Sequence, residues 1–336
     1  MNENVYILGI ETSCDETACA VVKNGNEILS NVVSSQINVH SKFGGVIPEV
    51  ASRLHIENIS LVIKEALEKA EIDPKDLAAV AVTSGPGLIG CLHIGLQAAK
   101  TLSFLYSKPL LGVNHLAGHI YANNFITKLR YPLLALVVSG GHSELVLVND
   151  EYCFDIIGST CDDAIGEAYD KVARLLGLGY PGGPLIDKLA KQGQKIYPFP
   201  RVKINGKYDF SFSGLKSSVL QLVKRLERNQ ETYKIEDIAC SFQEAVLGQL
   251  LNKTKMALDN FPVEQLVLAG GVSANSRLRQ LVLEDLQAQY PHIEMIVPPL
   301  WCCTDNAAMI AAAGFITLKK ELISNYTLSA DPSLSL

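Results

Sequence analysis

Two histidines, His115 and His119, stand four residues apart directly after the apolar run at residues 110–113. Asn114 lies between that run and the first histidine, and Asn is a preferred residue at the start of a helix. Residues 115–125 are therefore predicted to form a helix with both imidazoles on one face, where they can share one metal ion. Packing or capping histidines explain this spacing as often, so the rest of the chain has to distinguish the two interpretations.

Asp305 is the candidate for a third ligand, because it stands between a predicted strand at residues 293–297 and the last predicted helix at residues 306–321. Its alternative role is the N-cap of that helix, which is common for Asp. A His/His/Asp set leaves coordination positions open, as a catalytic site requires, and suits iron or zinc. A zinc peptidase helix is disfavoured, since it needs Glu directly after the first His and Leu116 stands there.

A glycine turn, Ser139-Gly140-Gly141-His142, follows the predicted strand at residues 133–138. Such a turn presents bare backbone N–H groups, which suit the close approach of a phosphate or carboxylate. A single turn of this kind is usually only a hairpin, so it carries little weight alone.

A second glycine pair, Gly270-Gly271, gives a stronger signal because it lies between an apolar strand and a predicted helix start. Glycines there admit a nucleotide, and the helix N-terminus favours negative charge. Asn275 is placed to bond a ribose or base. The segment is neither a Walker loop nor a dinucleotide fingerprint.

Two carboxylates, Asp170 and Asp187, flank the Gly- and Pro-rich turn at residues 180–184. Carboxylates on helix surfaces are usually only solvated. This turn should nevertheless bring both acids to one wall, and acids beside glycines commonly hold ribose hydroxyls. The acidic stretch at residues 11–16 supplies further acids near the first loops.

The elements that position these residues occur twice. Strands at 5–10, 17–23 and 27–34 recur as strands at 133–138, 143–148 and 152–159, and each set is followed later by a strand, a glycine turn and a helix. Two copies of one α/β unit are expected. The remaining predicted helices lie at 49–70, 88–105, 164–176, 214–228, 236–258 and 273–289, with an irregular stretch at 195–209 and a loose tail at 329–336.

Composition sets further limits. A chain of 336 residues exceeds what one core usually supports, and no apolar run approaches the ~18 residues of a membrane span. Neither a signal peptide at residues 1–5 nor a Cys-x-x-Cys pair is present, so buried thiols and a cytoplasmic location are expected. The net charge of −6 disfavours autonomous, tight binding of nucleic acid.

Nine ordered blocks of the chain together resemble the TsaD family, also called Gcp or YgjD, almost from end to end. These are residues 9–17, 44–53, 84–88, 115–119, 138–142, 180–184, 209–216, 269–275 and 303–306. The resemblance implies the duplicated fold of actin, the Hsp70 ATPase domain and sugar kinases, with two lobes around a nucleotide cleft. The expected lobes are 1–128 plus 306–336, and 129–305.

The resemblance also implies a reaction. The threonylcarbamoyl group of threonylcarbamoyl-adenylate passes to the exocyclic amine of the adenosine following the anticodon, in tRNAs that read ANN codons, and AMP is released. Implied partners are a degenerate actin-like paralogue subunit similar to TsaB and a P-loop ATPase subunit similar to TsaE, with no membrane.

By position, the resemblance makes His115, His119 and Asp305 the ligands of one divalent ion, with Fe²⁺ expected first and zinc second. The implied adenylate-binding positions are Val137, Val138, Ser139, Gly140, Gly141, Asp170, Gly183, Asp187 and Asn275. Asp15 and Glu16 are the candidates for a general base.

Three alternatives remain in play. An actin-like kinase or ATPase would use the loops at Asp15 and Ser139 on a triphosphate with magnesium, which leaves the histidine pair unexplained. A metallopeptidase is disfavoured by Leu116. An inert scaffold of a tRNA-modifying complex predicts that substitution of His115 or Asp305 leaves modification intact.

Overall fold

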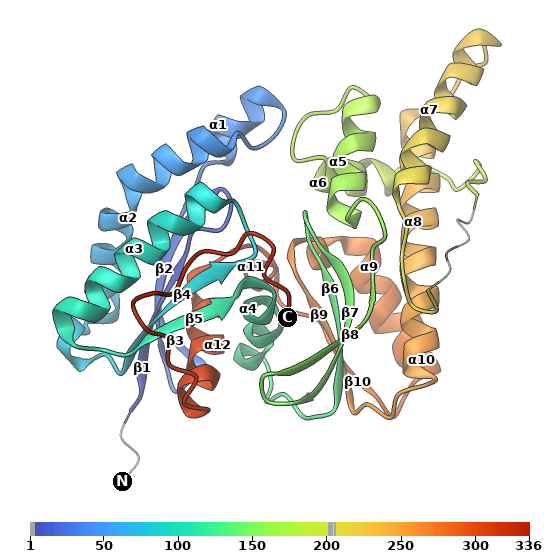
Figure 1. The fold of residues 1–336 in the computed structure, drawn as a ribbon. Coiled ribbons are helices and arrows are strands. Elements are labelled where there is room, and N and C mark those ends of the chain that lie inside the picture. The colour runs from blue at the N-terminus through green and yellow to red at the C-terminus, as the bar shows by residue number, and fades with distance from the viewer. Residues whose placement is uncertain (1–3, 201–203, 205) are drawn as a thin grey trace. The chain divides into compact units, whose positions relative to one another are not determined.

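The structure is a computed structural model that describes residues 4–200, 204 and 206–336 (Figure 1). It divides into two compact units. Unit 1 comprises the chain up to Leu129 together with Leu300–Leu336, and unit 2 comprises Arg130–Pro299. The second crossing between units therefore comes before Leu300 rather than at residue 306, so that Asp305 lies in the same unit as His115.

Unit 1 is built on a five-stranded sheet with strand order β3-β2-β1-β4-β5. The strands β1, β2 and β3 are antiparallel neighbours, while β4 and β5 run parallel to β1. Their bounds are Tyr6–Glu11 for β1, Glu16–Lys23 for β2, Glu27–Ser35 for β3, Ala79–Gly85 for β4 and Leu110–Asn114 for β5.

Helices cover both faces of this sheet. Leu8 and Ile10 pack with α2 (Pro48–Ala70) and α3 (Ile89–Tyr106), whereas the backbone of Gly9 lies against α12 (Ala307–Lys319). Alternate residues of a strand point to opposite faces, so the last helix closes the face that α2 and α3 leave open. The shorter helices are α1 (Ile37–His40), η1 (Ser41–Phe43), η2 (Pro74–Asp76), α4 (His115–Tyr121), η3 (Ala122–Phe125) and α11 (Leu300–Cys303).

Unit 2 repeats the same sheet, with strand order β8-β7-β6-β9-β10 when read from its antiparallel end. Its strands are β6 (Leu133–Val138), β7 (Ser143–Asp150), β8 (Cys153–Ser159), β9 (Gln265–Ala269) and β10 (Glu294–Ile296). The β6 strand pairs antiparallel with β7 and parallel with β9, as β1 does with β2 and β4. The predicted duplication is therefore confirmed.

One face of this second sheet packs against a helical layer, in which Leu134 and Leu136 meet side chains such as Tyr169, Phe242 and Leu250. The layer consists of α5 (Ile165–Leu175), α6 (Gly182–Ala190), α7 (Ser213–Arg228) and α8 (Ile235–Leu258). It continues through η4 (Gly271–Ala274), α9 (Ser276–Gln280), the π-helical η5 (Leu281–Leu286) and α10 (Gln287–Gln289). The single helix expected at 273–289 is thus a chain of short helices, and α6 was not predicted.

The C-terminal segment is ordered, contrary to the expectation of a loose tail. The Asp331 backbone N–H donates to the Ser84 carbonyl at 2.8 Å, and the Asn114 side-chain amide donates to the Leu334 carbonyl at 3.3 Å. The tail is held because the loop after β4 and the start of α4 offer backbone and amide groups that need partners.

Several other expectations can be compared with the structure. All eight cysteines are free, but Cys153 and Cys161 are exposed rather than buried. Within 195–209, the described residues form neither helix nor strand, and residues 201–203 and 205 lie outside the description. None of the described helices is long and apolar enough to cross a membrane.

Candidate functional site

The predicted histidine helix forms at the end of β5. The side chain of Asn114 caps α4 by accepting hydrogen bonds from the backbone N–H groups of Leu116 at 2.8 Å and Ala117 at 3.3 Å. Both imidazoles lie on one face, with ring centroids 4.7 Å apart. Helix capping thus fixes the position of His115 and, one turn later, of His119.

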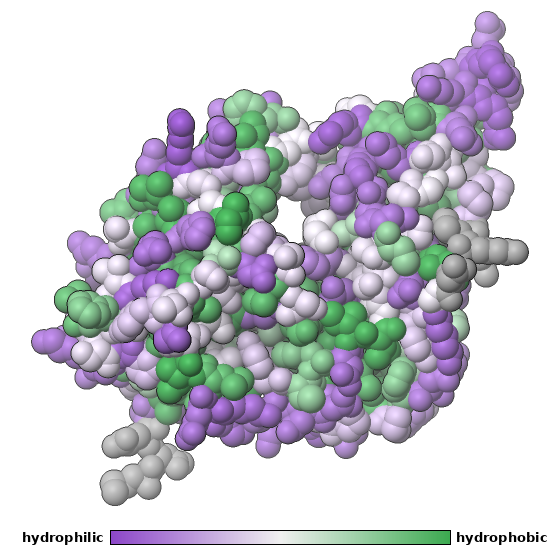
Figure 2. Space-filling view, viewed as in Figure 1, coloured by the Kyte–Doolittle hydropathy of each residue, from purple (hydrophilic) through white to green (hydrophobic). Residues whose placement is uncertain are grey.

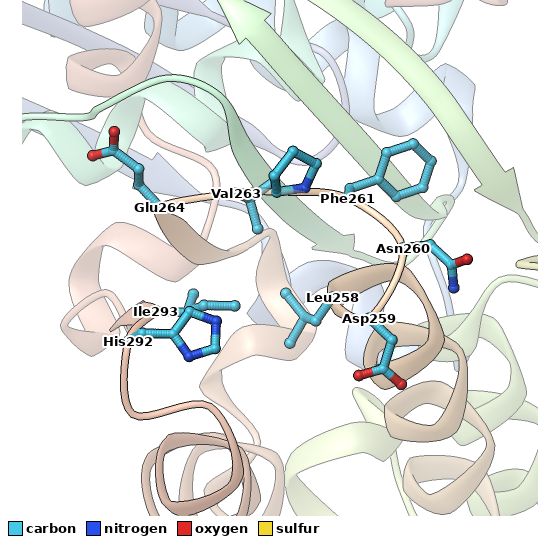
Figure 3. A pocket seen from close by; sticks show the side chains of 9 residues that line it. Leu258, Asp259, Asn260, Phe261, Val263, Glu264, His292 and Ile293 are labelled. Carbon is cyan, nitrogen blue, oxygen red and sulfur yellow. The ribbon is translucent and has the colours of Figure 1, made fainter.

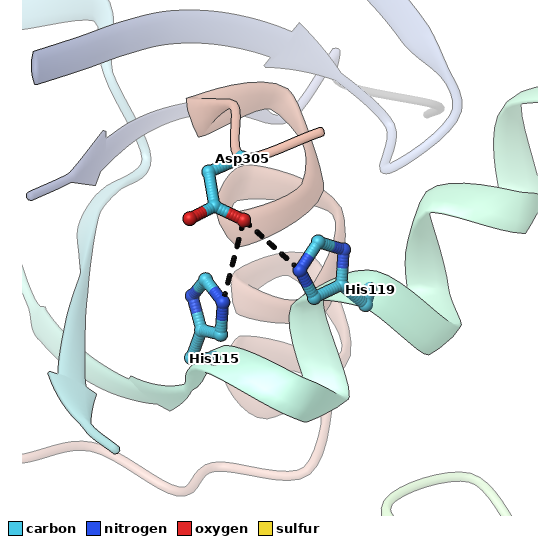
Figure 4. A group of neighbouring side chains, drawn as sticks. All are labelled: His115, His119 and Asp305. Atoms are coloured by element: carbon cyan, nitrogen blue, oxygen red, sulfur yellow. Dashed lines mark hydrogen bonds and ion pairs between the residues drawn. The ribbon is translucent and has the colours of Figure 1, made fainter. Parts of the chain in front are cut away.

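Asp305 reaches both rings from the other side (Figure 4). Its Oδ1 lies 3.1 Å from Nε2 of His119 and 3.5 Å from Nε2 of His115. The alternative role of Asp305 as a helix cap is wrong, because Asn306 caps α12 by accepting from the Met309 N–H at 3.1 Å. The carboxylate of Asp305 is therefore left to the histidines.

A second carboxylate, Glu11 at the end of β1, orients the first histidine from behind. Its Oε2 lies 2.9 Å from Nδ1 of His115 and also accepts a hydrogen bond from the Thr83 hydroxyl at 2.6 Å. Glu11 is almost fully buried. A carboxylate that holds the far nitrogen of a metal-binding histidine is a common arrangement, because it fixes the ring and its tautomer.

The charges in this cluster stabilise one another. Burial lowers the pKa of His115, but the carboxylates of Asp305 and Glu11 outweigh this effect and raise it to about 9. Burial raises the pKa of Asp305, but His115 and His119 outweigh that effect and lower it to about 2. Burial also raises the pKa of Glu11, but the charge and the hydrogen bond of His115 outweigh this effect and hold it below its ordinary value. Without a metal ion, these charges therefore hold His115 as an imidazolium between the carboxylates of Asp305 and Glu11.

The three side chains fit a divalent cation. One ligand atom from each of His115, His119 and Asp305 lies within 4.8 Å of the others. Asp305 is the sole polar contact recorded for the His119 ring among the described residues, and the Nδ1 of that ring is buried without a partner there. A divalent ion would balance the two carboxylates in place of the proton on His115.

Asp15 ends the loop between β1 and β2, and Glu16 follows it directly. Glu16 opens β2 and accepts a hydrogen bond from the Ser35 hydroxyl at 3.0 Å. Burial, followed by the negative charges of Asp305 and Asp15, raises the pKa of Glu16 to about 9. Without a metal ion, burial and these charges favour the protonated form of Glu16, so Asp15 is the stronger of the two candidate bases.

His55, which the sequence did not single out, anchors this acidic loop. It is fully buried on α2, with Nε2 donating to the Cys14 carbonyl at 2.9 Å and Nδ1 lying 2.7 Å from the Thr17 hydroxyl. A carbonyl can only accept, so Nε2 carries a proton, and burial is the main cause that lowers the pKa of this imidazole. Glu11 was likewise missed as a partner of His115, although it stands at the end of the first strand.

In unit 2 the glycine turn forms as predicted between β6 and β7. The Ser139 N–H donates to the His142 carbonyl at 2.8 Å, and Gly140 and Gly141 are exposed, with open space where a Cβ would stand. Val137 and Val138 are buried sheet residues. Of the predicted stretch, only the turn itself presents free surface to a ligand.

The predicted ribose-binding acid Asp170 lies on α5 and faces the start of α6. Its Oδ1 accepts from the Gly182 N–H at 2.7 Å. Burial raises the pKa of Asp170, and the N–H groups of Gly182 and Gly183 partly offset that rise. Asp170 and Gly183 are thus brought together, and the carboxylate acts here as a cap for α6.

Asp187 and Asn275 meet at the start of α9. Asp187 accepts from the hydroxyl and the N–H of Ser276, at 3.0 and 3.2 Å. Asn275 accepts from the Leu278 N–H at 2.9 Å and donates to the Gln243 side chain at 2.8 Å. Every predicted polar side chain of unit 2 therefore already has a protein partner.

A pocket of about 540 Å³ in unit 2 contains none of the predicted positions (Figure 3). Residues 258–264, His292 and Ile293 line it, at the N-terminal ends of β9 and β10. Ligands of open α/β sheets bind beyond the carboxyl ends of the parallel strands, where Ser139 and Gly270 lie. The pocket is therefore at the wrong end of the sheet for the adenylate.

The sequence is similar to one known family along most of its length. A family model described as TsaD, tRNA N6-adenosine threonylcarbamoyltransferase, matches residues 27–312. A protein of that description from Listeria welshimeri is 56% identical, over 100% of this chain and 98% of its own. One from Geobacillus thermodenitrificans is 54% identical with the same coverage.

Solved structures give the fold. HypF of T. kodakarensis matches with a TM-score of 0.64 and 15% identity, over 94% of this chain and 48% of its own. Component A of the Acidaminococcus fermentans (R)-2-hydroxyglutaryl-CoA dehydratase matches with a TM-score of 0.54 and 18% identity, over 95% and 99%. The duplicated actin-like, Hsp70-like and sugar-kinase fold is confirmed. The chain belongs to the TsaD family and is a transferase that modifies tRNA.

Proposed function

We propose that this enzyme transfers the threonylcarbamoyl group from threonylcarbamoyl-adenylate to the exocyclic amine of the adenosine following the anticodon, in tRNAs that read ANN codons. The amine nitrogen bonds to the carbamoyl carbon, the bond from that carbon to the phosphate oxygen breaks, and AMP leaves with the electron pair. The amine loses a proton to a base in the same sequence of events.

One observation carries the proposal: the convergence of His115, His119 and Asp305, with Glu11 behind His115. The site suits one divalent ion, Fe²⁺ first and zinc second, since two imidazoles and one carboxylate leave positions open. When bound, the ion supplies Lewis-acid polarisation of a carbonyl oxygen. The alternative kinase and scaffold functions give this buried cluster no role.

The chain's own residues have separate tasks in this proposal. The N–H groups of Gly140 and Gly141 approach the adenylate phosphate, where exposed amides can hold an anion. Asp170 and Asp187 use their remaining lone pairs for the ribose, because a carboxylate can accept more hydrogen bonds than the protein supplies. Asp15 takes the amine proton, because burial and the neighbouring negative charges favour the protonated form of Glu16.

Partners follow from charge and from the family. A chain of net charge −6 holds RNA weakly by itself, so a degenerate actin-like subunit and a P-loop ATPase subunit are proposed to assist it. We place the reaction in the cytoplasm, where eight free cysteines persist.

The test supplies labelled threonylcarbamoyl-adenylate and two transcripts of one ANN-reading tRNA, one native and one with guanosine replacing the adenosine after the anticodon. Label should enter the native transcript alone, with one AMP released for each group transferred. Equal labelling of both transcripts, or AMP release without labelled RNA in the presence of both helper subunits, would contradict the proposal.

A further inference from the structure

Positive charge is distributed very unevenly along this acidic chain. Residues 188–234 contain eleven Lys or Arg and three Asp or Glu, a balance of +8. Since the whole chain carries −6, the remaining residues carry −14. This basic segment spans the end of α6, the irregular stretch after it, and all of α7.

The α7 helix sorts its side chains into two faces. Leu215, Val219, Leu222 and Leu226 recur at helical spacing and are buried against unit 2. The outward face carries Ser217, Gln221, Lys224, Arg225 and Arg228, all of them exposed. In Figure 1 the far end of α7 projects from the rest of unit 2, and Figure 2 shows that end as strongly hydrophilic.

The ion pairs recorded among the described residues do not include the cations of α7. No ion pair is recorded for Lys216, Lys224, Arg225 or Arg228 with any described residue, although Glu227 lies on the same helix. Cations elsewhere in the chain do form ion pairs, since Lys64 pairs with Glu68 and Arg277 with Glu244.

Two further lysines of unit 2 donate to neutral oxygens. Lys207 donates to the side-chain oxygen of Asn260 at 3.0 Å, and Lys253 on α8 donates to the Lys207 carbonyl at 2.8 Å. These hydrogen bonds of Lys207 and Lys253 therefore bring no negative charge to either lysine.

Two ordinary explanations account for part of this pattern. A charged helix face is often only solvated, and Arg225 and Arg228 in the last turn stabilise the helix C-terminus. Neither accounts for a balance of +8 within one segment of an acidic protein.

We propose that the outward face of α7, formed by Ser217, Gln221, Lys224, Arg225 and Arg228, docks the sugar-phosphate backbone of the tRNA substrate. The proposal rests on the proposed function, which makes RNA the acceptor. Lys and Arg with interspersed Ser and Gln are the side chains that contact phosphate and sugar oxygens. Such contacts position an RNA without reading its sequence, so the face serves different tRNAs alike.

The test uses three variants of the full-length chain, each assayed with its helper subunits. The neutral variant is Lys224→Gln/Arg225→Gln/Arg228→Gln. A charge-retaining variant is Lys224→Arg/Arg225→Lys/Arg228→Lys, and the matched control Lys75→Gln/Lys319→Gln/Lys320→Gln removes three exposed charges from unit 1. The affinity for an unmodified tRNA transcript is measured by fluorescence anisotropy from 50 to 300 mM salt.

The neutral variant should bind at least about tenfold more weakly at 0.1 M salt, and its plot of log affinity against log salt should flatten by roughly 2 to 3, because each lost phosphate contact removes about 0.7–0.9 from the slope. The charge-retaining variant and the control should match the wild type. Wild-type binding and slope in the neutral variant, or equal weakening in the control, would overturn the proposal. Intact tRNA binding with loss of the ATPase subunit would assign the face to a protein partner instead.

The affinity for threonylcarbamoyl-adenylate, measured on the same variants without RNA, should be unchanged. If it falls together with tRNA affinity only in the neutral variant, the fold of unit 2 has been damaged and the docking role is rejected. Failure of the proposed function is distinguishable, because it would remove label transfer from the wild type while leaving this comparison of tRNA affinities readable.

Discussion

The two units share one sheet topology but use their polar side chains differently. In unit 1, Glu11, His115, His119 and Asp305 are packed against one another, and Asn306 takes over the helix cap that Asp305 would otherwise supply. In unit 2, Asp170, Asp187 and Asn275 are engaged with the starts of helices. Unit 1 therefore carries a group of charges of which none caps a helix, whereas unit 2 carries residues that also hold helix starts.

This difference teaches where substitutions can separate function from stability. In unit 1, Asp305 can be removed without loss of a helix cap, because Asn306 caps α12. Asp170 or Asp187 in unit 2 cannot be removed in this way, because its carboxylate accepts a hydrogen bond from an N–H group at a helix start. The loss of such a cap costs about 1 kcal/mol.

The largest effect should come from the adjacent pair Asp305 and Asn306. We expect Asp305→Ala to weaken metal binding by more than about 100-fold, since a direct ligand counts for more than an orienting partner. Asn306→Ala should instead lower the free energy of unfolding by about 1 kcal/mol through loss of the α12 cap. Metal analysis and denaturant unfolding of both variants measure this. Equal metal loss in the two would mean that the cap, and not the ligand, holds the site.

A smaller effect is expected from Glu11→Gln, which keeps the shape of the side chain and removes its charge. His115 would lose the carboxylate that fixes its ring, so metal affinity should fall roughly 10- to 100-fold. Competition with a chelator measures this directly. Glu264→Gln, at an exposed acid of unit 2, is the control. An unchanged affinity in Glu11→Gln would show that His115 is held by α4 alone.

In unit 2 two glycines should behave in opposite ways. Gly140 has open space at its Cβ position, so Gly140→Ala should leave stability unchanged and raise the KM for the adenylate by about tenfold, because the amide is less accessible. Gly270 has φ +87°, and a Cβ there would lie 2.5 Å from the Val138 carbonyl oxygen. Gly270→Ala should therefore destabilise the fold by more than about 1 kcal/mol. Unfolding curves and steady-state kinetics test the pair. A destabilised Gly140→Ala would make that turn structural.

The smallest effect concerns Asp162, another acid of unit 2 that holds a helix start. Burial raises its pKa, but hydrogen bonds from Ser211, Phe212 and Ser213 outweigh this and lower it below the ordinary value of 3.8. A lowered folded-state pKa gives stability that is fully present above pH 3.8 and is lost as the pH falls through the folded value.

Asp162→Asn should therefore be less stable than the wild type by roughly 0.5 kcal/mol at pH 7, because Asp162 is exposed and water screens its charge, with the gap constant down to about pH 5 and closing below pH 4. Asp285→Asn, at an exposed acid on η5, should show no such closing gap. Chemical unfolding between pH 3 and 7 provides the measurement. A gap that persists at pH 3 would assign the effect to hydrogen-bond geometry rather than charge.

The sequence predicted the duplicated sheets well, because turn residues bound each strand and the order of elements repeats. It also predicted α4 and its Asn114 cap, since the cap residue and the histidines are adjacent in the chain. Hydrogen-bond partners that are distant in the chain and meet only in the folded structure were not predicted. Glu11 lies about a hundred residues from His115, and His55 forty-one residues from the loop carbonyl it binds.

The ordered C-terminal segment and the short helix α6 were missed for the same physical reason. The residues around Leu334 carry no helical or strand pattern, and the segment is held by the loop after β4 and by Asn114. Local propensity does not reveal such long-range hydrogen bonding, and it does not show that Gly182 and Gly183 begin a helix under a carboxylate from α5.

The most direct test of the central claim is a paired measurement of metal content and label transfer to tRNA in His119→Ala, with His292→Ala as the control at an exposed histidine of unit 2. If the cluster in unit 1 supplies the chemistry, His119→Ala should lose both the metal ion and transfer, while the control and the wild type keep both. A His119→Ala enzyme that lacks the ion but transfers at the wild-type rate would contradict the account and make the cluster structural.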